Sequence, residues 1–409
     1  MHILFLSHYF PPEGNAPASR VHACARRWVE QGHEVTVITC APNVPGGVVY
    51  PGYRNRLVQR EVIDGITVIR VWTLLAANRG TMKRVLNFLS FMVGAICNGL
   101  FRRRPDVLIA TSPQFFCGWA GLVLARLKRV PFVLEIRDLW PESILAVGAR
   151  LPRPALRLLE WMEQRMYRGC NRLVTVGQGY HDRLLGKGVP AGKMSIIMNG
   201  VDTGLFQPRD PDPAFLEQWG LTGRFVCSYV GTIGMACGLD VVLAAARRLK
   251  AEGNTRVVFL LVGDGAAREC LQEEARSGQL DNIVFTGRQD KALIPDFLAA
   301  SQACLVHLRD RELFSTVMPS KIFEAAGMAR PIIIGVRGQA TDIVLEAGAG
   351  LAMAPESVDD LLAALETLVA DPARARSMGE AGMAYVCAHY ERNRLADTYL
   401  ALLAETAKG

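Results

Sequence analysis

The sequence has no cysteines at the spacing of a metal site or a redox motif. Its ten cysteines are scattered, with neither a C-x-x-C pair nor a Cys/His cluster. Most lie in apolar segments, such as Cys97, Cys117 and Cys304, where cysteine behaves as a small hydrophobe. This distribution argues against a zinc module, and it predicts a reducing compartment, the cytoplasm.

Long apolar runs are also missing. No stretch reaches the roughly 18 uncharged apolar residues expected of a membrane span, and Met1–Phe5 predicts a strand rather than a cleavable leader. The nearest approach, Val85–Phe101, carries Asn87, Ser90 and Asn98 and has basic residues at both ends. It is either a core helix of an α/β domain or a helix that lies in a membrane interface.

Two further signals do not occur. The dinucleotide fingerprint G-x-G-x-x-G is missing, which argues against a dehydrogenase. There is also no low-complexity segment and no repeat with a period of about 20–50 residues, which argues against a solenoid or an array.

What the chain does have is length and an uneven charge. Its 409 residues are too many for one ordinary domain and predict two or more. Residues 1–200 hold 26 Lys and Arg against 12 Asp and Glu, a balance of +14, and the remainder holds 20 against 27, a balance of −7. A negatively charged partner or surface should therefore meet the first half.

Short apolar strands alternate with helical patterns in both halves, which predicts two doubly wound parallel sheets. Strands are expected at His2–Ser7, Glu34–Cys40, Ile66–Thr73, Val107–Thr111, Phe132–Ile136, Arg172–Val176 and Ile196–Met198, and then at Phe225–Val230, Val257–Val262, Ile283–Thr286, Ala303–Val306 and Ile332–Gly335. Helices are expected at Arg20–Gln31, Arg84–Leu100, Phe116–Leu127, Pro154–Met166 and Gly179–Leu185, and then at Asp240–Leu249, Ala266–Ser277, Ala292–Ala300, Lys321–Gly327 and Val358–Ala370.

A Pro/Asp-rich stretch, Gln207–Pro213, separates the two series. The amphipathic helical stretch Pro372–Ala407 exceeds what the second sheet needs as cover. We therefore expect Rossmann-like domains at 1–204 and 205–385, and a helix at 386–409 that returns to the first domain.

The most informative segment runs from Thr316 to Gly327. Pro319 and Ser320 predict a helix start, with the Ser320 side chain able to cap free backbone N–H groups. Those groups and the helix dipole favour an anion, and Lys321 adds a positive charge. Glu324, one turn later, can accept hydrogen bonds from a vicinal diol. Together these residues predict a pocket for a nucleotide diphosphate.

Ligands of open α/β sheets bind beyond the carboxyl ends of the strands, so the other candidates lie in the loops there. Loop glycines of the second half can present N–H groups to phosphate oxygens, and other loop residues can frame a base or pair with the diphosphate. These candidates are Gly231, Thr232, Gly234, Gly263, Arg288 and Arg309. For Arg309 and its neighbour Arg311, a solvated run of charges is the alternative.

Two loops of the first half are candidates for the second substrate. The loop Ser7–Arg20 is long for its place, which suggests function, although a proline-stiffened structural loop is the alternative. After Phe132–Ile136, Asp138 could bind an acceptor hydroxyl or act as general base, unless Arg137 and Asp138 are a structural pair with Trp140 as packing. The candidates for the second substrate are His8, Glu13 and Asn15, and then Arg137, Asp138, Trp140 and Glu142, whereas Gly14 permits the close backbone approach of a phosphate-binding turn.

Three of these segments together resemble one family. His8–Glu13, Arg137–Ser143 and Pro319–Glu324 are similar to motifs of GT-B-fold, retaining glycosyltransferases of family 4, over essentially the whole chain. The surface-polysaccharide subgroup with N-acetyl-fucosaminyltransferases looks most similar. The resemblance implies two Rossmann-like domains that face each other across a cleft, with a nucleotide-diphosphate sugar, uridine at the family level, on the second domain and an acceptor on the first. It also implies no divalent metal and no cofactor.

The family's residues carry over only in part. Glu324 matches the glutamate that binds the ribose diol, whereas Thr316 stands where the first glutamate of the E-x7-E pattern would be. Thr232 and Cys237 replace a basic pair, so Lys321, and less directly Arg309, would supply the charge. The implied catalytic residues are Asp138, Lys321 and Glu324. The implied donor contacts are Gly14, Gly231, Thr232, Gly234, Gly263, Arg288, Arg309, Thr316, Pro319, Ser320, Lys321 and Glu324.

The implied acceptor contacts are His8, Glu13, Asn15, Arg137, Asp138, Trp140 and Glu142. The family's histidine in the loop after Val107–Ala110 is replaced by Thr111-Ser112-Pro113, so its role would pass to Asp138 or be dispensed with. We expect sugar transfer with retention to a polyprenyl-diphosphate-linked acceptor at the anionic inner face of the membrane, and no nucleic-acid partner. A sugar-nucleotide epimerase and a non-catalytic nucleotide-sugar-binding protein are the alternatives.

Overall fold

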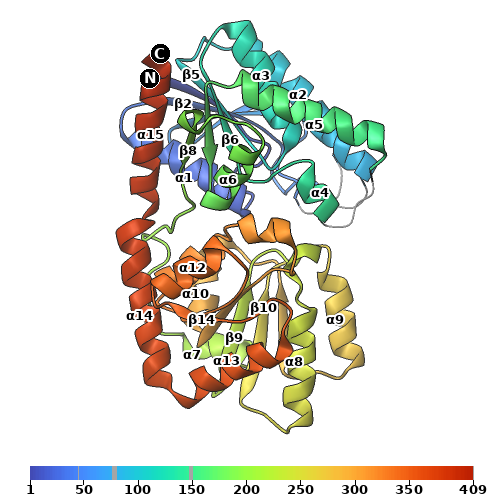
Figure 1. Ribbon diagram of the computed structural model, residues 1–409, viewed down its shortest axis with the longest axis vertical. Helices are drawn as coiled ribbons and strands as arrows, with labels where there is room; N and C mark the ends of the chain where they lie inside the picture. Colours follow the sequence, from blue (N-terminus) through green and yellow to red (C-terminus); the bar gives the residue numbers. More distant parts are fainter. Residues whose placement is uncertain (45, 76–80, 147–150, 409) are drawn as a thin grey trace. The chain divides into compact units, whose positions relative to one another are not determined.

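The computed structural model describes residues 1–44, 46–75, 81–146 and 151–408 (Figure 1). The chain forms two compact units: unit 1 is Met1–Met198 with Arg392–Gly409, and unit 2 is Asn199–Glu391. The boundaries between the units thus fall at 198/199 and 391/392, whereas the sequence predicts them at 204/205 and 385/386. The first boundary lies before the predicted position because the segment at Val201 belongs to unit 2, where the Val201 N–H donates to the Tyr390 carbonyl, 2.9 Å away.

The described part of unit 1 contains an eight-stranded sheet in the order β3-β4-β2-β1-β5-β6-β7-β8. Its strands are β1 (His2–Leu6), β2 (Glu34–Cys40), β3 (Val58–Ile63), β4 (Ile66–Val71), β5 (Val107–Thr111), β6 (Phe132–Ile136), β7 (Arg172–Thr175) and β8 (Met194–Ile196). Only β3 runs antiparallel to its neighbour. The chain winds outward from β1 in both directions, which confirms the doubly wound sheet.

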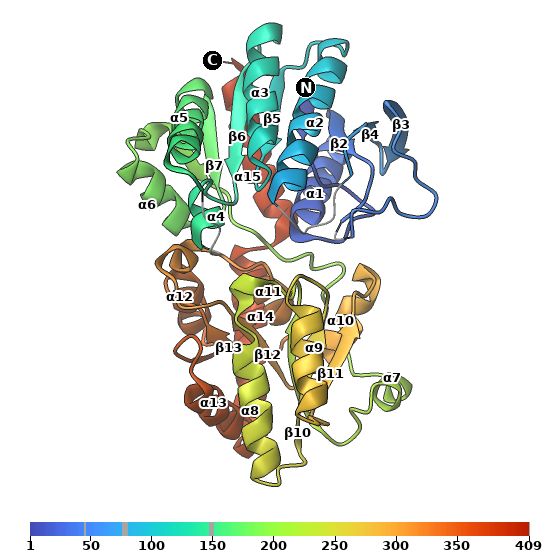
Figure 2. The same cartoon turned by 90° about the vertical axis from the view of Figure 1, so that its right-hand side faces the viewer.

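Helices cover both faces of this sheet. They are α1 (Ala16–Glu30), α2 (Thr81–Leu100), α3 (Phe115–Lys128), α4 (Glu142–Ala146), α5 (Arg153–Gly169), α6 (Gln178–Gly186) and α15 (Arg392–Lys408). Helices α2, α3 and α5 lie side by side (Figure 2). Helix α3 approaches the sheet closely at Gly121, where a Cβ would come within 2.6 Å of both Ala110 and Phe132.

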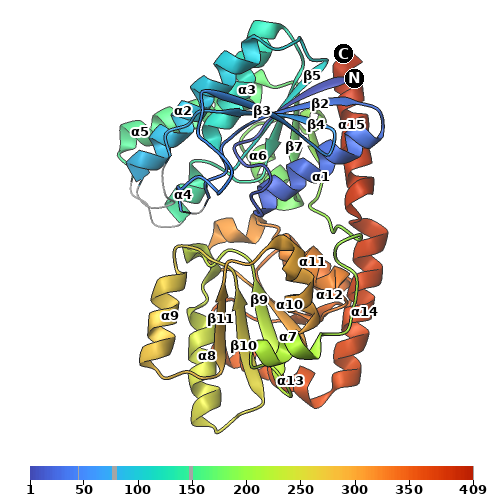
Figure 3. The same ribbon diagram turned by 180° about the vertical axis from the view of Figure 1, so that it is seen from behind.

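The C-terminal helix α15 belongs to unit 1 and packs beside α1 (Figure 3). The indole N–H of Trp28 donates to the Ala396 carbonyl at 2.9 Å, and the Trp28 ring meets the Tyr399 ring edge to face. Arg27 forms a two-pronged ion pair with Asp397. These contacts join the last helix of the chain to the first.

Strand β3 was not predicted. It pairs antiparallel with β4 through a two-residue turn in which Asp64 and Gly65 both have positive φ, 49° and 78°. Such a turn matches the twist of the strands it joins. Because β3 lies at the edge of the sheet, its side chains alternate between exposed and half-buried rather than forming an apolar run.

Unit 2 contains, in its described residues, a six-stranded and wholly parallel sheet in the order β11-β10-β9-β12-β13-β14. Its strands are β9 (Phe225–Val230), β10 (Val257–Val262), β11 (Ile283–Gly287), β12 (Ala303–His307), β13 (Ile332–Gly335) and β14 (Gly350–Ala352). Its helices are α7 (Pro213–Gln218), α8 (Asp240–Ala251), α9 (Arg268–Ser277), α10 (Ile294–Ala299), α11 (Lys321–Gly327), α12 (Gln339–Glu346), α13 (Val358–Ala370) and α14 (Pro372–His389). Side chains of α8, α9 and α13 share one core with the strands.

Candidate active site

Backbone hydrogen bonds of glycine residues link the ends of three strands in unit 2. The Gly231 N–H donates to the Val262 carbonyl at 2.9 Å, and the Gly263 N–H donates to the Gly287 carbonyl at 3.0 Å. Gly263 has φ of +140°, and a Cβ there would stand 1.9 Å from the Gly231 carbonyl oxygen. The loops after β9 and β10 can therefore approach this closely only because Gly263 lacks a side chain.

Lys321 reaches this place from the first turn of α11. Its ammonium nitrogen lies 3.5 Å from the ring centroid of Tyr229, the penultimate residue of β9. The same nitrogen lies 3.2 Å from the point where a Cβ of Gly231 would be, so the glycine makes room for the lysine. Burial lowers the pKa of Lys321 to about 8, while Glu324 opposes that shift. A partly desolvated cation thus stands beside the glycine loop.

Tyr229 also fixes the loop that follows β9. Its hydroxyl donates to the Thr232 carbonyl at 2.8 Å, and the Cys237 thiol contacts the same oxygen at 3.2 Å. Thr232 is exposed and Gly234 is half-buried. Sequence reasoning missed Tyr229, because an aromatic residue inside an apolar strand is indistinguishable from ordinary core.

His307 and Arg309 tie this loop to neighbouring ones. His307 accepts a hydrogen bond from the Glu356 N–H at Nε2, so its Nδ1 carries the proton and donates to the Cys237 carbonyl at 2.7 Å. Arg309 donates to the Met235 carbonyl and forms ion pairs with Asp240 and Glu356. Two carboxylates thus pair with Arg309 in this structure, and its role as a diphosphate partner stays a prediction.

The segment leading into α11 differs from expectation in its cap. Ser320 has helical backbone angles and makes no side-chain capping bond, so the predicted cap is wrong. Thr316 donates its hydroxyl to the Leu313 carbonyl at 2.7 Å, and Pro319 accepts at its carbonyl from the Ile322 N–H. Glu324 is half-buried one turn along. Arg288 is exposed directly after β11, and its donor role stays a prediction.

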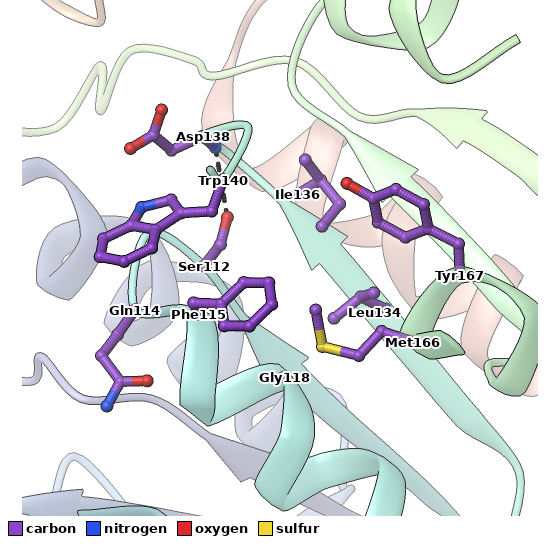
Figure 4. A pocket seen from close by; sticks show the side chains of 10 residues that line it. All are labelled: Ser112, Gln114, Phe115, Gly118, Leu134, Ile136, Asp138, Trp140, Met166 and Tyr167. Carbon is purple, nitrogen blue, oxygen red and sulfur yellow. Dashed lines mark hydrogen bonds between the residues drawn. The ribbon is translucent and has the colours of Figure 1, made fainter. Parts of the chain in front are cut away.

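In unit 1, Asp138 follows β6 at the rim of a small apolar pocket. Its backbone N–H and that of Arg137 both donate to the Ser112 hydroxyl, at 3.2 and 2.7 Å. The Asp138 carboxylate points away from the floor formed by Leu134 and Met166 (Figure 4). Burial raises the pKa of Asp138 to about 7, although hydrogen bonds from Ser143 and Trp140 oppose the shift.

Beneath Asp138 lies a buried ion pair that sequence reasoning missed. Glu135, within β6, accepts from Arg20 Nε at 3.1 Å and from the Thr111 hydroxyl at 2.8 Å. Burial opposes ionisation of Glu135, but Arg20 and Arg137 outweigh it and hold its pKa below the ordinary value. Burial lowers the pKa of Arg137 to about 10, and its Nε and Nη1 atoms have no partner within the described chain.

Most predicted residues of the Ser7–Arg20 loop serve the fold. His8 is 3% exposed and meets the rings of Tyr9, Phe88 and Phe91 edge to face; burial lowers its pKa to about 3. Glu13 is buried and accepts from the N–H groups of residues 43 and 44, while burial raises its pKa to about 7. These side chains brace the loop from inside.

Of the remaining predicted residues of unit 1, Asn15, Trp140 and Glu142 make contacts within the protein. The Asn15 side chain caps α1 by accepting from the Ala18 N–H at 2.9 Å. Trp140 stacks on Phe115, which supports the interpretation of this ring as packing, and Glu142 pairs with Lys187 at 3.0 Å. A Cβ on exposed Gly14 would meet nothing within 4 Å, so no steric need for glycine exists there.

Two features are absent from the residues that the structure describes. No group of three or more His, Cys, Asp or Glu side chains is arranged to hold a metal ion. None of the helices described has the length and apolar character needed to cross a membrane.

Known proteins resemble this chain in structure and in sequence. Anabaena HepE, solved in complex with UDP-glucose, superposes with a TM-score of 0.74 at 16% identity and covers 99% of this chain and 100% of its own. WcaI of Escherichia coli K12, named for a role as a colanic acid biosynthesis glycosyl transferase, is 28% identical over 347 residues, 82% of this chain and 84% of WcaI. A Mycobacterium tuberculosis GDP-mannose-dependent alpha-(1-6)-phosphatidylinositol monomannoside mannosyltransferase is 29% identical over 336 residues, 75% of this chain and 83% of the relative.

Two parallel-sheet units of this kind define the GT-B fold. Residues 15–200 match the glycosyl transferase 4-like domain, and residues 224–371 match the glycosyl transferases group 1 domain. The chain therefore belongs to the glycosyltransferases of the GT4, GT-B type.

Proposed function

We propose that this glycosyltransferase moves a sugar, with retention, from a nucleotide-diphosphate donor to a lipid-linked acceptor in the synthesis of a bacterial surface polysaccharide. The observation that carries the donor half is the Lys321 ammonium, held over Tyr229 beside Gly231. Departure of the leaving group develops negative charge on the diphosphate. A cation already in place stabilises that charge more in the transition state than in the ground state.

Each donor residue has one task in this proposal. Lys321 binds the diphosphate, and the backbone N–H groups of Thr232 and Gly234 approach its oxygens, because those of Gly231 and Ile233 donate to the Val262 and Asp264 carbonyls. Glu324 accepts hydrogen bonds from the ribose diol. Gly263 allows the close approach of backbone that shapes the loop. The reaction needs no metal ion, because Lys321 supplies the charge.

Uridine is the base that we propose, because the similar HepE structure contains UDP-glucose. The mycobacterial relative is named for GDP-mannose, which makes guanosine the base that a binding experiment has to exclude. For the sugar we propose an N-acetylated deoxyhexosamine, on the resemblance of the motifs to N-acetyl-fucosaminyltransferases.

The acceptor side of the proposal rests on Asp138 and Arg137. Asp138 binds the acceptor hydroxyl, and a pKa near 7 lets it also accept that proton as general base. The unpartnered Arg137 nitrogens suit a phosphate oxygen. A polyprenyl-diphosphate-linked sugar at the inner face of the cytoplasmic membrane has this chemistry, and the balance of +14 in residues 1–200 favours peripheral association with such an anionic surface.

The test has two stages. A panel of UDP- and GDP-sugars is screened for thermal stabilisation of the protein, since a ligand that binds only the folded state raises Tm. The stabilising donor is then incubated with polyprenyl-diphosphate-linked sugars, with and without EDTA, and the anomeric configuration of the product is determined. We expect transfer with retention in both conditions. Inversion, or stabilisation by no sugar nucleotide, would overturn the proposal.

A further inference from the structure

Helix α2 exposes an apolar stripe to solvent. Leu86, Val93 and Leu100 are 45%, 56% and 41% exposed, and Phe101, directly after the helix, is 87% exposed. Residues spaced by seven lie on one face of a helix, so Leu86, Val93 and Leu100 lie along one side of α2. The opposite face is buried against the unit through Phe88, among others. A surface helix ordinarily carries polar residues where α2 carries this stripe.

The polar residues of α2 do not interrupt the stripe, because they bond within the chain. Asn87 is buried and donates to the Leu74 carbonyl at 2.7 Å. The Ser90 hydroxyl donates to the Asn87 carbonyl and accepts from the Leu74 N–H. Asn98 donates to the Gly94 carbonyl at 2.9 Å. One face of the predicted helix Val85–Phe101 is thus core, and the other is apolar surface.

Basic residues stand at both ends of the stripe. Lys83 and Arg84 are exposed at its start, and Arg103 and Arg104 are exposed just beyond its end. Residues 81–131, which include α2 and α3, hold eight Lys or Arg and one acidic residue, Asp106. An apolar strip with cationic ends is complementary to an anionic lipid surface, where the basic groups meet headgroups and the apolar groups enter the boundary of the acyl chains.

A second observation comes from the neighbouring helix α5. Trp161 is 60% exposed and stacks on Trp119 of α3, with ring centroids 6.4 Å apart. Exposed arginines, Arg157 and Arg165, lie one turn to either side of it. Tryptophan is enriched at the level of lipid headgroups, because its ring is apolar with one polar edge. Helices α2, α3 and α5 form one layer of unit 1 (Figures 1 and 2).

We infer that the stripe Leu86–Val93–Leu100–Phe101, with its basic ends, docks unit 1 onto a bilayer rich in anionic phospholipid. The inference deepens the proposed membrane association by naming its surface. Charge complementarity favours lipid over a second copy of the chain, because two such patches would bring like charges together. Docking has an electrostatic part, which salt screens, and an apolar part, which salt does not remove.

Vesicle flotation of the full-length protein tests the inference. The protein should bind vesicles of phosphatidylcholine mixed with phosphatidylglycerol, and bind weakly to phosphatidylcholine alone. Replacing Val93→Glu and Phe101→Glu should weaken binding by at least about tenfold at low and high salt, because charged groups do not enter the acyl boundary. Replacing Lys83→Gln, Arg84→Gln and Arg103→Gln should weaken it by roughly 100-fold at low salt and less at high salt. The control Leu345→Glu changes an exposed leucine of unit 2 and should bind like the wild type.

The outcomes separate this inference from the proposed function. Thermal stabilisation by the donor is measured on every variant, and its retention shows that the α2 substitutions leave the fold and the donor site intact. Wild-type binding by the Val93→Glu, Phe101→Glu variant would overturn the docking surface. A wild-type dimer that dissociates in this variant would also overturn the docking surface, because the stripe would then be a contact between two copies of the protein. A protein that floats with vesicles but is stabilised by no sugar nucleotide would contradict the proposed function alone.

Discussion

The loops at the carboxyl ends of the two sheets are built in different ways. In unit 2, glycines bring the backbones of neighbouring loops together, and one lysine side chain lies beside them. In unit 1, side chains such as His8 and Glu13 turn inward and brace the loops, which leaves Asp138 and Arg137 as the polar candidates. One region is shaped by the lack of side chains and the other by buried ones. A diphosphate needs N–H groups and a charge, which backbone and one lysine can supply.

Among substitutions that test this difference between the units, we expect the largest loss of stability at Gly263. Alanine there would place its Cβ 1.9 Å from the Gly231 carbonyl oxygen at a positive φ, so the loop must move. We expect Gly263→Ala to lower the free energy of unfolding of unit 2 by about 3 kcal/mol or more, and to abolish donor binding. Denaturant unfolding followed by probes in each unit measures the change. An unperturbed midpoint would show that the loops are not packed as described.

Asp138 should show the next largest effect, with the opposite sign. Its pKa is raised from 3.8 to about 7, so the folded state binds the proton more tightly, and ionisation destabilises the fold increasingly as pH rises from about 4 to 7. Asp138→Asn should therefore be more stable than the wild type by about 2 kcal/mol at pH 8, with little difference at pH 4. Its transfer rate should fall while donor binding persists, because a stability cost of this kind marks a functional residue. Lower stability of the variant at pH 8 would refute this role for burial.

The pH dependence of donor binding tests whether the charge in unit 2 comes from Lys321. The Lys321 ammonium must be protonated to bind a diphosphate, and burial lowers its pKa to about 8. Affinity for the sugar nucleotide should be constant below that pH and fall about tenfold per unit above it. Lys321→Arg is the matched variant, since a guanidinium stays charged and should give a flat profile. A flat profile for the wild type would mean that Lys321 does not face the diphosphate.

The smallest effect is expected at Gly14. Its Cβ would meet nothing within 4 Å and its φ lies outside the left-handed region. Gly14→Ala should change the unfolding free energy by less than about 0.5 kcal/mol and leave donor binding unchanged. A clear loss of binding, measured by thermal stabilisation, would restore the donor contact that the sequence suggested.

The fold was largely predictable because its strands are buried. Strands such as β2, β5 and β13 are almost wholly buried and match the predicted bounds. Strand β3 was missed because an edge strand is half polar, although the Asp64-Gly65 pair was the signal that could have found it. The three-residue β14 is too short to stand out, and a Cβ on its Gly350 would stand 1.8 Å from the Ile332 carbonyl oxygen, a close approach that no local pattern reveals.

The local geometry around Gly231 and Lys321 was more predictable than that of the loops of unit 1, for a physical reason. Gly231 and Lys321 are recognisable because glycine and a lone lysine are unusual next to apolar strands. Whether a polar side chain such as His8 points to solvent or inward depends on neighbours far along the chain, here Phe88 and Phe91. The same holds for the Arg20–Glu135 pair, whose members are 115 residues apart.

The central claim is that Lys321 holds the donor diphosphate, and calorimetry of the sugar nucleotide with Lys321→Ala tests it most directly. Loss of a charge-assisted contact of about 2–3 kcal/mol should weaken binding by roughly 30- to 150-fold. Arg374→Ala, which removes an exposed positive charge elsewhere in unit 2, should bind like the wild type. If Lys321→Ala bound the sugar nucleotide as tightly as the wild type does, the assignment of the donor site would be contradicted.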